Sequence, residues 1–350
     1  MNSIKVKLSF IANFIAIFAL IALGIISFYF TQASLYEATL QNQTNLLKIT
    51  QTTVEDFRSK NIAFIENLAK DITSLPLNAI NSEEGLIQNT GHLLKSYRHG
   101  INALAVYIGQ SNGENIVSDE SSDKLKTNVI INGKANGYDA TSRPWYQDAK
   151  NQNSVIASPT YIDAASKQHV ISYSKALYKD GKFIGVLGID ILLTSFQNQI
   201  ERIPGNAFLF DRQNQIFAAA NKQLLDPSVN HTPVLNAYKA NGDYNFFTYS
   251  LNEQKRLGIC TKVFTYTACV TESADVINKP VMKIAFIQTA IVIFTSIISI
   301  ILLYFIVSKY LSPLAAIQTG LTSFFDFINH KTKNVSTIEV KSKDEFGQIS

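Results

Sequence analysis

Two long apolar runs divide the chain. Residues 8–30 are 23 consecutive positions without a charge, and residues 284–307 are 24. Each run exceeds the roughly 20 residues that a helix needs to cross the bilayer hydrocarbon. A cleaved signal peptide is the alternative for the first run, but that run is longer than a typical signal core and no small-x-small site follows it. The pattern predicts two transmembrane helices.

Lysines flank the two runs unevenly. Lys5 and Lys7 precede the first run, and no basic residue follows it until Lys48. Lys309, Lys331 and Lys333 are among the lysines that follow the second run, although Lys279 and Lys283 on its other side weaken the contrast. Because positive charge concentrates on the cytoplasmic side, residues 1–7 are predicted as a cytoplasmic N-terminus and residues 31–283 as a domain outside the inner membrane, in the periplasm.

A helical pattern continues from the first run through residues 31–75. Apolar residues recur mostly at spacings of three, four or seven (Leu47, Val54, Phe57, Phe64, Ile65, Leu68, Ile72 and Leu75), with no Gly or Pro before Pro76. This spacing predicts one long helix that ends near residue 74. Its apolar stripe packs on its own domain, on a second copy of the chain, or on both.

The pattern then becomes typical of strands. Short apolar runs occupy 103–108, 170–174 and 183–189, with a hairpin turn expected at 179–181. A second, smaller set occupies 207–210, 216–218 and 245–249 and the surroundings of Ile259 and Tyr266. The expected fold class is α+β, with two antiparallel-sheet modules in series: a membrane-distal one at 76–200 and a membrane-proximal one at 201–283.

The only two cysteines are Cys260 and Cys269, and both lie in the segment expected outside the cytoplasm. Each fits one limb of a hairpin, so a disulfide is predicted. No histidine lies close by to complete a metal site, and no metal is expected.

An apolar seam follows the second run. Leu314, Ile317, Leu321, Phe324 and Ile328 are spaced by three, four, three and four residues, which predicts a helix that packs on partner helices and therefore at least a homodimer. A proline precedes the seam, and Asp344-Glu345-Phe346-Gly347 follows a polar connector. Residues 308–350 resemble an incomplete HAMP linker, which implies an output domain beyond Ser350.

Charge and motifs argue against several functions. The net charge of +4 carries no dense basic patch, so no nucleic-acid partner is expected. A Gly-x-Ser-x-Gly match at 109–113 reads as a turn, because a strand and not a helix is expected after it. The five histidines are scattered and no phosphate-binding loop occurs. Binding without catalysis, and without a cofactor, is the expected class.

Residues 136–149 carry the candidate site. Trp145, the only tryptophan, follows Arg143, whose planar guanidinium suits a carboxylate. Asp163 lies two residues after Tyr161, and Asp190 sits in an otherwise apolar strand. These residues would suit a zwitterion. The alternative is a buried structural ion pair between Arg143 and Asp190, with Trp145 as core.

These residues also carry a family resemblance. The motif Tyr-Asp-x-x-x-Arg-Pro-Trp-Tyr-x-x-Ala, then Tyr-x-Asp and Gly-x-x-Gly-x-Asp, resembles the double Cache (dCache) domain of bacterial chemoreceptors, built from PAS-like sheets, and within it the subset that recognises amino acids. The resemblance implies that four residues face the ligand carboxylate (Tyr138, Arg143, Trp145 and Tyr146). It implies that Asp163 and Asp190 bind the ammonium and that Tyr161 lines the pocket.

The predicted function is that of a two-span chemoreceptor that senses an amino acid and signals through a cytoplasmic kinase and adaptor. A sensor histidine kinase or a cyclic-dinucleotide enzyme with the same input is the alternative. A membrane-tethered structural or adhesion protein without a small ligand is a third possibility. The linker sequence around Ile317 and Phe324 is more similar to chemoreceptors.

Overall fold

The computed structural model describes residues 4–333. One compact unit comprises Thr39–Ala274, and a second combines the segment up to Ala38 with the segment from Asp275 onward. The α-helices are α1 (Ile4–Ser74), α2 (Leu77–Ile80), α3 (Glu83–Ile101), α4 (Glu120–Lys124), α5 (Pro144–Lys150), α6 (Leu193–Ile200), α7 (Thr232–Asn241), α8 (Asp275–Tyr310) and α9 (Ser312–Ile328), with short 3₁₀ turns at Lys134–Asn136, Ala140–Ser142 and Lys222–Leu225.

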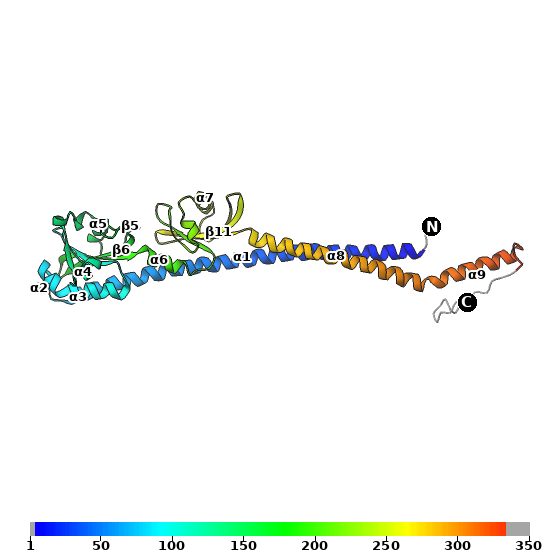
Figure 1. The fold of residues 1–350 in the computed structure, drawn as a ribbon, viewed down its shortest axis with the longest axis horizontal. Coiled ribbons are helices and arrows are strands. Elements are labelled where there is room, and N and C mark those ends of the chain that lie inside the picture. The colour runs from blue at the N-terminus through cyan, green and yellow to red at the C-terminus, as the bar shows by residue number, and fades with distance from the viewer. Residues whose placement is uncertain (1–3, 334–350) are drawn as a thin grey trace. The chain divides into compact units, whose positions relative to one another are not determined.

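The strands form two antiparallel sheets. They are β1 (Ala105–Gly109), β2 (Asn115–Ser118), β3 (Ile130–Asn132), β4 (Ile156–Ala157), β5 (Tyr161–Ile162), β6 (His169–Lys179), β7 (Lys182–Leu192), β8 (Asn206–Phe210), β9 (Ile216–Ala219), β10 (Phe246–Leu251), β11 (Gln254–Val263) and β12 (Tyr266–Ser273). We call residues 77–200 the first module and residues 206–273 the second module. Figure 1 shows the two modules one after the other along α1. The α+β fold with tandem sheets is confirmed.

Both sheets share one topology. The first runs β3-β2-β1-β7-β6-β4, with β5 also paired to β6, and the second runs β10-β11-β12-β8-β9. In each module the first strand therefore pairs with the last one, β1 with β7 and β8 with β12. This shared order allows positions of the two sheets to be compared strand by strand.

Helix α1 extends without a break to Ser74, as the spacing of its apolar residues predicted. Its buried stripe includes Leu47, Val54, Ile65 and Ile72. Residues of both sheets join this stripe in a single core cluster, so α1 is a common wall of the two modules.

Alternation along the strands gives each sheet two apolar faces. In the first module Val106 and Ile108 face the α1 core, while Tyr107 packs with Trp145 on the outer face. In the second module the inner face joins the same core, and the outer face forms a separate cluster around Phe208 and Phe210. Each outer face carries a cavity, described below.

The predicted hairpin turns are present. Asp180 and Gly181, both with positive φ, connect β6 to β7 and produce the tight turn expected at 179–181. After β1 the chain turns at 110–114 and returns as the antiparallel strand β2. The Gly-x-Ser-x-Gly sequence therefore lies in a hairpin and lacks the following helix that a nucleophile elbow needs.

The predicted disulfide is confirmed. Cys260 and Cys269 are directly opposite each other in β11 and β12, and their sulfurs are bonded. The bond lies on the outer face of the second sheet, in the cluster with Phe208 and Phe210.

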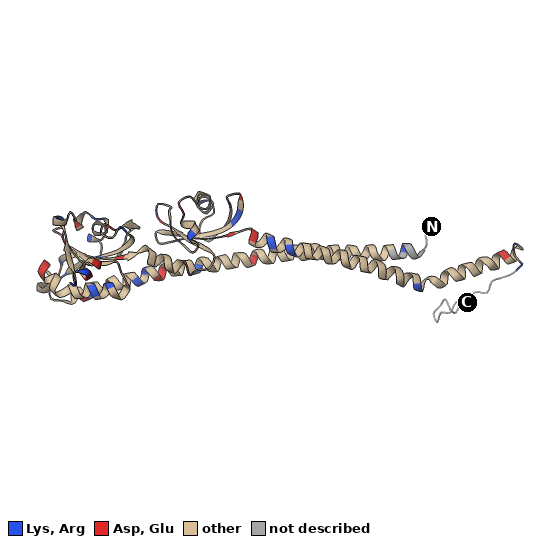
Figure 2. Ribbon diagram, in the orientation of Figure 1, with Lys and Arg blue, Asp and Glu red and all other residues tan. Residues whose placement is uncertain are grey.

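Within residues 4–333, two helical segments are long and apolar enough to cross a membrane. They begin at Phe10 in α1 and at Asp275 in α8, and their most apolar windows are almost entirely unburied. Figure 2 shows a stretch of each helix with no charged residue. The seam of α9 is also exposed, at Leu314, Leu321, Phe324 and Ile328. The acidic sequence at 344–347 lies outside the described residues.

Candidate functional site

The outer face of the first sheet carries a cavity of about 430 Å³. Six of the seven residues predicted for the ligand site line it: Tyr138, Arg143, Trp145, Tyr161, Asp163 and Asp190. They come from the loop before α5, from α5 itself, from the β5–β6 hairpin and from β7. The fold therefore brings together residues that are up to 52 positions apart in the chain.

Asp190 forms the polar floor of this cavity. Its side chain is only 3% exposed, because β7 is a central strand of the sheet. Tyr107 donates a hydrogen bond to Asp190 Oδ1 over 2.7 Å, and Ser172 donates another. The Tyr161 hydroxyl lies 3.3 Å from the same oxygen and 2.6 Å from the Ser172 hydroxyl. Three hydroxyl groups thus hold one carboxyl group in place.

Burial changes the proton affinities of these groups. Removal from water raises the pKa of Asp190 to about 6, and the hydrogen bonds from Ser172 and Tyr107 oppose that rise. Burial raises the pKa of Tyr107 and Tyr161 as well, with a further contribution from the nearby Asp190 carboxylate. The tyrosines therefore remain protonated donors, while Asp190 titrates close to neutral pH.

Asp163 supplies the second acid of the cavity. Its Oδ2 accepts hydrogen bonds from the backbone N–H groups of Ala165 (3.1 Å) and Ser166 (2.6 Å), which shapes the hairpin between β5 and β6. Its Oδ1 makes no hydrogen bond to another described residue. This leaves one oxygen of Asp163 for a ligand.

Arg143 supplies the cation. It lies immediately before Pro144, the first residue of α5, in the extended conformation that a residue before proline prefers. Its guanidinium carbon is 5.9 Å from the centre of the Tyr138 ring, and its buried Nε has no hydrogen-bond partner among residues 4–333. No ion pair joins Arg143 to Asp190, so the alternative of a buried structural pair is wrong.

Aromatic rings form the apolar part of the cavity. The Trp145 and Tyr107 rings pack with their centroids 4.7 Å apart. Gly188, opposite Tyr107 in the sheet, makes room for this arrangement, because a Cβ at Gly188 would lie 2.1 Å from the Tyr107 ring. Glycine is thus required at this position in order for Tyr107 to reach Asp190.

Tyr146 differs from the other six predicted residues, because it does not line the cavity. It is 1% exposed and packs behind Trp145, with 5.8 Å between the ring centroids, and on Phe183. Successive residues of a helix point about 100° apart, so α5 cannot present both Trp145 and Tyr146 to one cavity.

Several lining residues were not among the predicted site residues. Tyr107 was not selected because strand alternation alone does not give the absolute face of a strand. Asn115 and Lys124 come from β2 and α4, far from the motif in sequence. The Asn115 Oδ1 atom is buried without a hydrogen-bond partner among the described residues, so it is a further acceptor in the cavity.

The arrangement can bind a small zwitterion. Arg143 with the Tyr138 hydroxyl can take a carboxylate, Asp163 and Asp190 can take an ammonium group, and Trp145 offers an apolar surface. No acid-base pair with an adjacent nucleophile lines the cavity in the part of the chain that the structure describes.

Comparison with known proteins agrees with this geometry. Residues 80–198 match the family described as the methyl-accepting chemotaxis protein-like first PDC sensor domain. The solved ligand-binding domain of the Campylobacter jejuni chemoreceptor Tlp3, in complex with L-norvaline, is 56% identical, with a TM-score of 0.67. The match covers 72% of this chain and 97% of that domain. The chain belongs to the methyl-accepting chemotaxis protein family of chemoreceptors.

A second structure of Tlp3 and one further relative extend the comparison. The Tlp3 sensory domain with isoleucine bound is 55% identical to this chemoreceptor, with a TM-score of 0.66, and the match covers 71% of this chain and 98% of that domain. Methyl-accepting chemotaxis protein McpA of Pseudomonas putida is 27% identical over 57% of this chain. The match spans only 30% of the length of McpA.

Proposed function

We propose that this chain is the sensing part of a chemoreceptor that binds an aliphatic α-amino acid in the first module. The observation that carries the proposal is the meeting of Arg143 with Asp163 and Asp190 in one cavity beside Trp145. The related Tlp3 domain, 56% identical, has been solved with L-norvaline, and it has also been solved with isoleucine.

In the proposed complex the ligand carboxylate pairs with Arg143 and the Tyr138 hydroxyl. The ammonium group lies against Asp190 and Asp163 Oδ1, with Tyr161 beside it. An ammonium bound at Asp190 offsets the free-energy cost of removing that carboxylate from water, because a buried acid without a cation holds its proton more tightly. The aliphatic side chain packs on Trp145.

Calorimetric titration of the full chain in lipid nanodiscs tests this proposal. We expect L-isoleucine, L-valine and L-norvaline to bind, and Arg143→Ala to weaken binding by about tenfold to a hundredfold, the usual effect of losing a charged hydrogen bond. The exposed Arg202 gives a matched control, since Arg202→Ala removes the same charge away from the cavity. Absence of binding by all three amino acids, or equal binding by Arg143→Ala, would refute the proposal.

The proposed membrane arrangement follows the two apolar helical segments. Residues 8–30 and 284–307 cross the inner membrane, residues 31–283 form the extracytoplasmic double Cache domain, and 308–350 begin a HAMP linker. The length and composition of α1 and α8 support the two spans. The first module is then the membrane-distal one and the second module the membrane-proximal one.

The proposed output is chemotaxis signalling through a dimer and a cytoplasmic kinase with its adaptor. Curated relatives from Pseudomonas putida and Bacillus subtilis are named methyl-accepting chemotaxis proteins, which favours this output over a histidine kinase or a cyclic-dinucleotide enzyme. The exposed apolar seam of α9 supports a dimer, because such a seam is stable only against a partner helix.

A further inference from the structure

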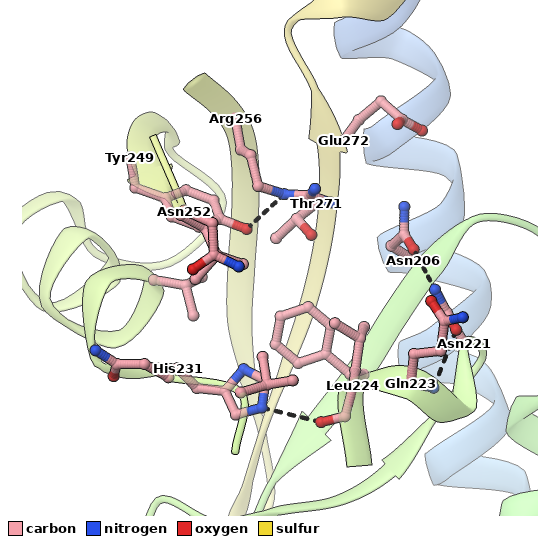
Figure 3. A pocket seen from close by; sticks show the side chains of 15 residues that line it. Asn206, Asn221, Gln223, Leu224, His231, Tyr249, Asn252, Arg256, Thr271 and Glu272 are labelled. Carbon is pink, nitrogen blue, oxygen red and sulfur yellow. Dashed lines mark hydrogen bonds between the residues drawn. The ribbon is translucent and has the colours of Figure 1, made fainter. Parts of the chain in front are cut away.

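The second module has a cavity of its own. It has a volume of about 270 Å³ and lies on the outer face of the second sheet, beside the cluster that contains the disulfide. Figure 3 shows its side chains, which include an arginine, several amides and hydroxyl groups. Phe208 and Val234 are among its apolar lining residues. None of the residues singled out from the sequence motif lies here.

The register of the two sheets allows this cavity to be compared with the first. In the first module Asp190 of β7 is opposite Ala105, the first residue of β1. In the second module Thr271 of β12 is opposite Asn206, the first residue of β8. Thr271 therefore occupies the position of Asp190, and a neutral hydroxyl replaces the carboxyl group that would hold an ammonium.

A second difference lies on the neighbouring strand. Val170 of β6 is opposite Leu192, two residues beyond Asp190. At the matching place in the second module, Arg256 of β11 is opposite Ser273, two residues beyond Thr271. An arginine thus replaces an apolar residue. Relative to the first cavity, this part of the second one has lost an acid and gained a cation.

Arg256 is held in place but remains available. Its Nε donates a hydrogen bond to the Tyr249 hydroxyl over 3.1 Å, which fixes the orientation of the guanidinium (Figure 3). No carboxylate of residues 4–333 lies within ion-pair distance of it. Nearby Thr271 is 1% exposed and lines the same cavity. Its hydroxyl group and the Arg256 guanidinium together favour an anionic ligand.

Other titratable groups line the cavity. Glu272, next to Thr271 in β12, is one of them, and its Oε1 accepts a hydrogen bond from the backbone N–H of Ser273. His231 forms a hydrogen bond between its Nε2 atom and the Leu224 carbonyl oxygen. Burial lowers the pKa of His231, so the ring is neutral at neutral pH. Arg256 therefore supplies the one positive charge among the described lining residues.

We propose that the second module binds a small monocarboxylate anion that has no ammonium group, such as pyruvate, lactate or acetate. The carboxylate pairs with the Arg256 guanidinium and accepts a hydrogen bond from Thr271. The short apolar end of the anion packs on Phe208 and Val234. This site goes beyond the amino-acid site, and it does not depend on that site being occupied.

The test uses the full chain in nanodiscs with the Arg143→Ala substitution, which removes the proposed amino-acid site. Sodium pyruvate, sodium L-lactate and sodium acetate are titrated by calorimetry, with L-alanine as the amino counterpart of pyruvate. We expect at least one anion to bind saturably and L-alanine to bind at least about tenfold more weakly, because Thr271 replaces the acid that would meet its ammonium.

Variants then locate the binding. Arg256→Gln should weaken anion binding by about tenfold or more, whereas Arg212→Gln, at an exposed position of the same module, should not change it. If Arg256→Gln fails to fold, Thr271→Val, which keeps the side-chain shape, takes its place and should also weaken binding. The proposal is overturned if no anion binds, if L-alanine binds as well as pyruvate, or if the folded variant binds the anion as tightly as its parent.

Discussion

At the scale of single residues, Asp190 determines how the first cavity responds to pH. It is buried, it accepts hydrogen bonds from Tyr107 and Ser172, and its pKa is raised to about 6. In the ligand-free protein this carboxyl group therefore holds a proton over a range where an exposed aspartate has lost it. Ligand binding through an ammonium group requires the ionised form.

Amino-acid affinity should therefore fall in acid. We expect a constant dissociation constant above about pH 7 and a loss of up to about tenfold per pH unit below pH 6, as Asp190 takes up a proton. The same pKa shift also determines how the stability of the folded protein changes with pH. A pKa raised in the folded state makes the ligand-free protein lose stability as pH rises from about 4 to about 6.

Calorimetry between pH 5 and pH 8 measures this dependence. Asp190→Asn should bind weakly with a nearly flat pH profile, because the titrating group is gone. A parent protein with unchanged affinity down to pH 5 would show that Asp190 is not the group that receives the ammonium.

Gly188 controls the position of Tyr107. In Gly188→Ala the new methyl group would lie 2.1 Å from the Tyr107 ring, so the ring must move and its 2.7 Å hydrogen bond to Asp190 is lost. We expect amino-acid affinity to fall about tenfold or more and the free energy of unfolding to fall by about 1–3 kcal/mol. Titration calorimetry and urea denaturation measure the two effects.

Gly100 supplies the matched control. It lies exposed in α3, and a Cβ there would meet nothing within 4 Å. Gly100→Ala should leave affinity unchanged and slightly increase stability, since alanine favours helix more than glycine does. Equal affinity of Gly188→Ala and the parent would mean that Tyr107 does not contribute to the site.

At the scale of secondary-structure elements, the sequence predicted most of the helices, strands and turns. The unbroken helix to Ser74, the hairpin at Asp180–Gly181 and the opposed cysteines all depend on local spacing or on turn residues, which sequence displays directly. The direction of a single side chain in α5 was harder. Trp145 faces the cavity and Tyr146 the core, because that choice depends on how the short helix packs.

The second cavity shows more clearly what the sequence alone does not predict. Arg256, Thr271 and Asn206 lie on three different strands, and no motif connects them in the sequence. Only the register of β11, β12 and β8 shows that they share a face and that Thr271 matches Asp190. β8 and β12 are far apart in the sequence, so residue spacing along one strand does not show which of their residues are opposite each other.

The β11–β12 hairpin should depend on its disulfide. Replacing Cys260 and Cys269 together by alanine frees a short loop, which should lower the free energy of unfolding by about 2–3 kcal/mol. Urea denaturation with and without the pair measures the loss. Amino-acid affinity at the first cavity is the control and should not change, because the disulfide lies in the second module. A change below 0.5 kcal/mol would mean that the sheet holds this hairpin unaided.

At the scale of the whole molecule, the exposed seam of α9 predicts an assembly. Leu321 lies on the seam and is 45% exposed in the single chain. Leu321→Cys should form an intermolecular disulfide readily when membranes containing the full chain are oxidised, because equivalent seam positions of a parallel pair face each other. The introduced cysteine would be the only free thiol, since the only two native cysteines are bonded to each other.

Thr319→Cys provides the comparison, because residue 319 lies on the opposite side of α9 from Leu321. It should cross-link much more slowly. Equal rates at the two positions, read from non-reducing gels, would contradict a dimer with this seam at its centre.

Helix α1 has a final consequence for how the sensor melts. Because its buried stripe completes the cores of both sheets, neither module can lose its inner layer while the other keeps α1 fully packed. On heating, residues 39–274 should therefore unfold in a single cooperative transition and not in two separate ones. A ligand bound in either cavity would then stabilise both modules against thermal unfolding.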